Sequence, residues 1–193
     1  MTETTSKRDE ILDVAEGMIR SAGFNGFSTR DVAGAVGIKA ASVHYHFPTK
    51  ADIGVAVTGR YTDRFLEALG DPDRFEGDPR QVVTLYVDSF RQALVRDGKL
   101  CLCAVLGAEI GGLPTEVGRH TRIFFERNLV WLRKALTASS QISAAKAKAY
   151  AIHILAALEG AMILSKSLND ERIFESVART LTSLKNDRAC PAA

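Results

Sequence analysis

Apolar residues recur every three or four positions through most of the chain, and this spacing predicts amphipathic helices. The longest patterns run from Ile53 to Phe65, from Phe125 to Leu136 and from Ala144 to Ser167. No stretch keeps the alternation of apolar and polar residues that a half-buried strand requires. Turn signals such as Gly70-Asp71-Pro72 separate the patterns. The sequence therefore predicts an all-α protein.

The repeating apolar positions also predict which face of each helix is buried. The expected core positions are Ile11, Ala15, Met18 and Ala22 in the first helix; Ile53, Val57, Tyr61 and Phe65 in the helix that ends near Gly70; Val83, Val87, Phe90 and Leu94; and Phe125, Leu129, Leu132 and Leu136. Residues 1–50 and 51–193 are the two domains that we expect.

The segment from Ala144 to Ser167 is apolar on two faces. One stripe contains Ala151, Leu155, Leu158 and Met162, and the other contains Ala149, Ile152, Ala156, Gly160 and Ile163. A helix with two apolar faces is buried on both sides. With Ile173, Val177, Leu181 and Leu184 in the last helix, this pattern predicts a four-helix interface between two copies of the chain. A central helix in a larger monomeric core is the alternative.

Residues 26–50 predict two short helices joined by a glycine turn, the layout of a helix-turn-helix within residues 28–47. Ser28 is expected to cap the first helix, with Asp31 completing a capping box. Gly37 permits the left-handed conformation that ends this helix. The next helix is expected to read DNA, because its small first residues allow close approach to base edges.

The predicted DNA contacts lie around this turn. Lys50, at the start of a helix that Thr49 caps, suits a backbone phosphate. Core packing is the alternative for the aromatic residues, and it is the expected role of Phe24, Phe27 and Phe47. The full set of predicted DNA-binding residues is Thr29, Arg30, Lys39, Ala40, Ala41, Ser42, His44, Tyr45, His46 and Lys50.

Residues Lys7 to about Leu69 resemble the amino-terminal domain of TetR-family transcriptional regulators. The resemblance rests on Gly23-Phe24, Phe27-Ser28-Thr29-Arg30-Asp31-Val32-Ala33, Val36-Gly37-Ile38 and Ser42-Val43-His44-Tyr45-His46-Phe47, followed by Lys50. His44 stands where many members carry tyrosine. The resemblance implies a homodimeric repressor that binds a palindromic operator and is released by a small-molecule effector held in the carboxy-terminal domain.

Composition narrows the cellular setting. The chain has 193 residues, a net charge of +2 and three cysteines, an odd number that excludes a complete intrachain disulfide framework. We expect a cytoplasmic protein with no membrane span and no signal peptide. Residues 1–60 contain seven basic and seven acidic side chains, so DNA affinity must come from a few well-placed cations and from two copies acting together.

The sequence gives less information about the identity of the effector. Cys101 and Cys103 follow Lys99 at the start of a predicted helix, where a thiol is reactive toward oxidants and electrophiles. Some TetR-family repressors that sense electrophiles carry a cysteine near this helix. Simple packing of small apolar side chains is the alternative, and a bridge between subunits or to Cys190 stays open. The remaining ligand candidates are Glu109, Phe124 and His153.

No sequence motif indicates a catalytic group, a metal site or a cofactor site, so we expect a protein that is not an enzyme. Two other classes remain as alternatives. One is an all-α small-molecule or protein-partner binding module that does not regulate transcription, and the other is a helical enzyme. The set of candidate DNA contacts argues against the first, and the lack of a nucleophile and base motif argues against the second.

Overall fold

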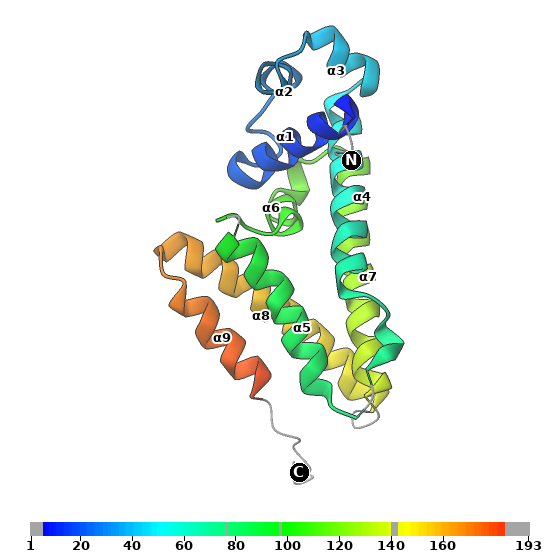
Figure 1. Ribbon diagram of the computed structural model, residues 1–193, viewed down its shortest axis with the longest axis vertical. Coiled ribbons are helices and arrows are strands. Elements are labelled where there is room, and N and C mark those ends of the chain that lie inside the picture. The colour runs from blue at the N-terminus through cyan, green and yellow to red at the C-terminus, as the bar shows by residue number, and fades with distance from the viewer. Residues whose placement is uncertain (1–5, 76, 97, 140–142, 184–193) are drawn as a thin grey trace, which may run out of the picture. The chain divides into compact units, whose positions relative to one another are not determined.

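The computed structural model describes residues 6–75, 77–96, 98–139 and 143–183 (Figure 1). Within this part of the chain every regular element is helical, so the all-α prediction is confirmed. The elements are α1 (Lys7–Ala22), α2 (Thr29–Val36), α3 (Ala40–His46), α4 (Lys50–Leu69), η1 (Pro72–Arg74), α5 (Pro79–Arg91), η2 (Gln92–Arg96), α6 (Leu102–Ala108), η3 (Ile110–Gly112), α7 (Thr115–Ala138), α8 (Ala144–Leu168) and α9 (Arg172–Thr182).

Local side-chain caps set the ends of the short helices. At the start of α2 the Asp31 N–H donates to Ser28 Oγ at 3.3 Å, and the Ser28 N–H donates to Asp31 Oδ2 at 2.7 Å. This reciprocal pair is the predicted capping box. Thr49 and Asp52 repeat it at the start of α4. Gly37 ends α2 with a φ of 74°, a left-handed conformation that glycine adopts without strain.

The chain divides into two compact units. The first comprises residues 1–64 and 100–125, and the second comprises residues 65–99 and 126–193. The boundary that the sequence predicts, between residues 50 and 51, falls in the first turn of α4, and the first unit continues beyond it to Arg64. Residues 100–125, which contain α6, belong to the same unit as the amino-terminal helices.

The core of the first unit is apolar and aromatic. The predicted core residues Phe24, Phe27 and Phe47 are buried, and the rings of Phe24 and Phe27 meet edge to face at 6.0 Å. On α1 the buried residues include Ile11, Leu12, Ala15 and Ile19. The predicted positions Met18 and Ala22 are wrong for this face, since Met18 is only half-buried and Ala22 is exposed.

An ion cluster connects α1 with α4 in the first unit. Glu16 is largely buried and faces three guanidinium groups, those of Arg20, Arg60 and Arg64. Arg60 also pairs with Asp13 at 2.7 Å. A buried carboxylate needs such partners, because an uncompensated charge in the interior is costly. The cluster therefore fixes α4 against α1.

The second unit contains an aromatic core with a few internal hydrogen bonds. Tyr86, fully buried on α5, donates from its hydroxyl to Asn128 Oδ1 at 2.8 Å. The indole of Trp131 donates to the Gly70 carbonyl at 2.7 Å, so this residue supports the end of α4. Arg91 on α5 holds Glu175 on α9 with two nitrogen–oxygen contacts of 2.7 and 3.1 Å. α9 runs beside α8 and α5 (Figure 1).

The two stripes predicted on α8 differ in their surroundings. Ala151, Leu155, Leu158 and Met162 are buried within the second unit. The other stripe is open: Ala149, Ile152, Ala156 and Ile163 are exposed, with Ile152 at 51% and Ile163 at 42%. Leu164 and Leu168 add to this face at 51% and 65%.

α8 is also relevant to the prediction that the chain contains no apolar segment long enough to span a membrane. α8 is long enough and apolar enough to cross a membrane, with a mean hydropathy of 1.4 over its best 18-residue window. That expectation is therefore wrong as far as length and composition go. The core helix of a soluble protein can be equally long and apolar, and 39% of the most apolar part of α8 is buried inside the structure. Packing within the second unit accounts for one of its two apolar faces.

Candidate nucleic-acid interface and effector residues

α3 presents an exposed polar and aromatic face. Val43 is fully buried and anchors the helix, while Ala41, Ser42, His44 and Tyr45 are exposed. Tyr45 is 86% exposed, an unusual position for a large aromatic side chain. Its ring meets the imidazole of His46 edge to face at 5.3 Å. Exposed aromatic surface beside hydrogen-bonding groups is typical of a binding face.

The other predicted contacts lie around this face. Arg30 on α2 and Lys39 at the start of α3 are exposed, whereas Thr29 and Ala40 are half-buried. The His44 ring nitrogen Nδ1 lies 3.2 Å from the Pro48 carbonyl oxygen, so this imidazole is held at the end of α3 by the backbone. His46 is half-buried. Among the predicted contacts, Arg30 and Lys39 are thus the exposed cations that can reach phosphates.

Lys50 is placed differently from the simple phosphate contact that the sequence predicts. Its Nζ lies 4.6 Å from the ring centroids of both Phe24 and Phe27, which is cation–π geometry. Partial burial lowers the pKa of Lys50, and the carboxylates of Glu109 and Asp31 oppose that shift. The amine therefore holds the α1–α2 connection against α4, in addition to any role at DNA.

Glu109, a predicted ligand residue, contacts the same connection. Its Oε2 accepts a hydrogen bond from the Phe24 N–H at 2.8 Å. A side chain at Gly23 would collide with this carboxylate, because a Cβ there would lie 2.0 Å from Glu109 Oε1. The carboxylate following α6 thus caps the backbone after α1.

A buried cluster gathers three of the predicted effector residues. Cys101 is the residue that precedes α6, Cys103 lies in its first turn, and both thiols are buried. The Tyr61 hydroxyl hydrogen-bonds to Cys101, and the Tyr61 ring lies 5.7 Å from the ring of Phe124. The sequence predicted Tyr61 only as a core residue, since nothing local connects residue 61 with residue 101.

Arg20 places a positively charged side chain beside this cluster. Its Nε donates to the Leu100 carbonyl at 2.8 Å, directly before the two cysteines. Burial raises the pKa of Tyr61 well above its usual value, Cys101 and Cys103 act in the same direction, and Arg20 opposes them. The thiols therefore share a buried polar environment with a phenol and a guanidinium group.

His153 is exposed on α8 in the second unit. Cys190 lies outside the described residues. Among the residues that the structure describes, no group of three or more histidine, cysteine, aspartate and glutamate side chains has the arrangement of a metal site.

Two surface hollows are formed within single units. The first, in the amino-terminal unit, has a volume of about 400 Å³ and is lined by Lys7, Ile38, Ala41, Ser42, Tyr45 and His46. Three of these residues, Ala41, Ser42 and Tyr45, are predicted DNA contacts on the exposed face of α3. Lys7 and Ile38 are not among the predicted contacts; Lys7 is distant in sequence and comes close to α3 only in the folded unit, whereas Ile38 lies two residues before it.

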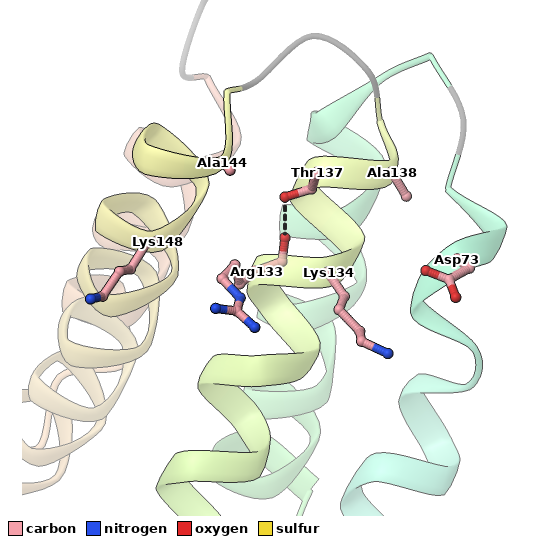
Figure 2. Close-up of a pocket in the computed structure, with 7 residues that line it drawn as sticks. All are labelled: Asp73, Arg133, Lys134, Thr137, Ala138, Ala144 and Lys148. Carbon is pink, nitrogen blue, oxygen red and sulfur yellow. Dashed lines mark hydrogen bonds between the residues drawn. The ribbon is translucent and has the colours of Figure 1, made fainter.

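The second hollow lies in the carboxy-terminal unit, between the end of α7 and the start of α8, and measures about 440 Å³ (Figure 2). Three of its residues, Arg133, Lys134 and Lys148, are exposed cations, and Asp73 is on its edge. The Arg133 side chain lies on the side of α7 that faces α8, whereas the Lys148 side chain points away from α7. No predicted ligand residue lines this hollow.

A capped helix-turn-helix whose second helix exposes aromatic and polar side chains defines a DNA-binding protein. The comparisons agree with this class. Residues 11–57 match the family model for bacterial regulatory proteins of the TetR family, and residues 79–180 match the model for the carboxy-terminal domain of LmrA/YxaF-like transcriptional regulators. The chain belongs to the TetR family of transcriptional regulators.

Solved structures extend the match over nearly the whole chain. A TetR transcriptional regulator from Legionella pneumophila is 29% identical, with a TM-score of 0.86 over 93% of this chain and 97% of that one. A TetR-family regulator from Agrobacterium tumefaciens is 28% identical, with a TM-score of 0.83 over 91% and 95%.

A more distant structure shares the fold alone. FadR from Bacillus subtilis, solved in complex with stearoyl-CoA, is 17% identical, with a TM-score of 0.73 over 92% and 98% of the two chains. No curated protein sequence matches this chain significantly. Transcription regulation and DNA binding through the helix-turn-helix follow from the family, whose members are generally not enzymes.

Proposed function

We propose that this protein is a homodimeric repressor that binds a palindromic operator and is released by a small-molecule or electrophile effector in the cytoplasm. The observation that carries the proposal is the open face of α3, on which Tyr45 is 86% exposed beside Ala41 and Ser42. Small residues at the start of a reading helix allow close approach to base edges, and the aromatic ring reaches the groove wall.

The exposed stripe of α8 supports dimerisation. Ile152, Ile163, Leu164 and Leu168 are each at least 42% exposed in the single chain, and such a row of apolar side chains marks an association surface. Gly160 lies on the same helix, and a Cβ there would meet nothing within 4 Å. A second α8 can therefore approach closely, with α9 alongside, as a two-fold four-helix interface requires.

A two-fold dimer determines the form of the operator. The two α3 helices read half-sites whose centres are about 34–36 Å apart, one turn of the double helix. An effector that binds better to a dimer with another spacing lowers operator affinity by its differential affinity for the two states. This mechanism needs no chemistry on the effector, in keeping with a protein that is not an enzyme.

Two effector classes are favoured by different observations. The fold accommodates a small molecule in at least one relative, the FadR structure with stearoyl-CoA. The cluster of Cys101, Cys103 and Tyr61 favours an electrophile or oxidant, because modification of either buried thiol would disrupt the Tyr61 hydrogen bond and its surroundings. Burial of both thiols makes this reaction dependent on local opening of the unit.

The experiment that tests the proposal is selection of random duplex DNA on the purified protein, read by sequencing. The expected result is a palindrome with half-sites one helical turn apart. Recovery of no enriched sequence would refute the assignment and return the non-regulatory binding module to consideration.

Repeating the selection after treatment with methylglyoxal tests the effector. Loss of the palindrome in the wild type but not in a Cys101→Ser/Cys103→Ser variant supports the thiol mechanism. Equal recovery with and without methylglyoxal would favour a reversible small-molecule inducer.

A further inference from the structure

The hollow between α1 and α3 has the features of a nucleotide subsite. Its lining combines an apolar wall, from Ile38 and Ala41, with the exposed ring of Tyr45 and a cation, Lys7, which belongs to a different helix. Its volume is about 400 Å³. It opens on the face of α3 that the proposed function assigns to DNA.

The apolar wall suits one base edge in particular. In the major groove only thymine presents a methyl group, and apolar side chains recognise it by contact. Ile38 is half-buried at the turn before α3, and Ala41 is exposed as the second residue of that helix. Neither side chain offers a hydrogen bond, so this wall distinguishes bases through the methyl group alone.

Lys7 is positioned to hold the phosphate beside that base. Its side chain is 57% exposed, and its Nζ lies 2.7 Å from Glu10 Oε2, one turn along α1. Next to it, the Arg8 guanidinium lies 5.1 Å above the ring of Phe47, which fastens the start of α1 to the end of α3. The Arg8 contact therefore holds the start of α1, and Lys7 with it, near the reading helix, while the amine itself pairs with Glu10.

We propose that the hollow of Lys7, Ile38, Ala41 and Tyr45 is a thymine subsite of the operator, in which Ile38 and Ala41 contact the 5-methyl group and Lys7 binds the adjoining phosphate. Glu10 acts as an internal competitor for the Lys7 amine. The inference rests on the proposed DNA-binding function and adds the base that one part of the interface selects.

The first test uses the palindrome recovered by selection and compares Lys7→Gln with Glu10→Gln. Both variants remove the same ion pair, so a purely structural role gives the same effect in both. The subsite predicts different effects on operator affinity. Lys7→Gln lowers the affinity about equally for all sequences, and Glu10→Gln leaves the affinity unchanged or raises it. Between about 50 and 200 mM salt, each lost phosphate contact lowers the slope of log affinity against log salt by about 0.9.

A dimer has two copies of Lys7, so the slope should fall by about 1.8 in Lys7→Gln. Lys134→Gln, which removes a cation of the second unit, is the matched charge control and should leave the slope unchanged. An unchanged slope in Lys7→Gln, or equal effects of Lys7→Gln and Glu10→Gln, would overturn the phosphate contact.

The second test replaces thymine by uracil at each position of the half-site, which removes only the methyl group. The wild-type protein should lose about fivefold or more in affinity at one symmetric position, in line with the lower range of single base contacts. Ile38→Ala should show no loss there, and Ala41→Ser provides a second variant if Ile38→Ala folds poorly.

Indifference of the wild type to uracil at every position would overturn the methyl contact while leaving the regulator intact. Failure to recover any palindrome would instead refute the proposed function, and the subsite with it.

Discussion

Substitution of Ile152 by aspartate should separate the proposed dimer. Full burial of an isoleucine side chain contributes about 1.5–3 kcal/mol, and Ile152 is 51% exposed in the single chain. Covering its exposed half therefore contributes about 1 kcal/mol. A two-fold interface contains the residue twice, which makes about 2 kcal/mol per dimer.

Aspartate adds a second cost, because each carboxylate that loses water without gaining a partner costs about 1–3 kcal/mol. The total is at least about 4 kcal/mol, which corresponds to roughly a thousandfold weaker dimer. Sedimentation velocity over a concentration series measures this change directly. The matched control is Gln81→Asp, which places the same charge at an exposed position of α5 and should leave the dimer intact.

Two results would refute the reasoning. One is a wild-type protein that sediments as a monomer at all concentrations. The other is an Ile152→Asp variant that keeps the wild-type dissociation constant while its circular dichroism shows intact helices. A folded monomer that also loses operator affinity would connect dimerisation with DNA binding, because each half-site alone is bound weakly.

Four further substitutions test the first and second units. Ser28→Ala should lower the free energy of unfolding by about 1 kcal/mol through loss of the α2 cap, measured by urea denaturation, and no change would mean that the cap does not stabilise α2. Hydrogen bonds from the Ser28 side chain and backbone hold the pKa of Asp31 below its usual value of 3.8, so its stabilising effect is present above that pH and is lost as the pH falls through the lower folded pKa. The urea midpoint of Asp31→Asn should therefore lie below that of the wild type at pH 7, and the difference should shrink as the solution is acidified below pH 3.8. Lys50→Ala should lower stability by about 1–2 kcal/mol through loss of two cation–π contacts, whereas a pure phosphate contact predicts weaker DNA binding with unchanged stability. Tyr86→Phe should cost about 1–2 kcal/mol, since it removes the buried hydrogen bond to Asn128, and a change below about 0.5 kcal/mol would show that the bond contributes little.

The features that the sequence predicted well depend on residues close together in the chain. The Ser28–Asp31 capping box, the left-handed Gly37 and the two stripes of α8 each involve spacings of a few residues. Helix caps and helical periodicity act over this range, so they can be read before the fold is known.

The features that the sequence did not reveal depend on contacts between distant segments. Lys50 follows a helix cap and suits a phosphate by position alone, but its amine lies over rings that come from residues 24 and 27. Glu109 meets the Phe24 N–H across 85 residues of chain, and Tyr61 meets Cys101 across 40. Lys7 joins the DNA-facing hollow for the same reason. No local pattern encodes such pairings.

The contact of Glu109 with Gly23 and Phe24 restricts how such regulators can be recombined. One such recombination exchanges the amino-terminal residues 1–50 for those of another family member. Here the segment after α6 reaches back to the backbone after α1, and it fits only because residue 23 has no side chain. A graft that carries residues 1–50 from a donor with a larger residue at position 23 would therefore clash with Glu109. A chimera of this protein should therefore keep glycine at position 23, where φ is +79° and a side chain would displace the Glu109 carboxylate.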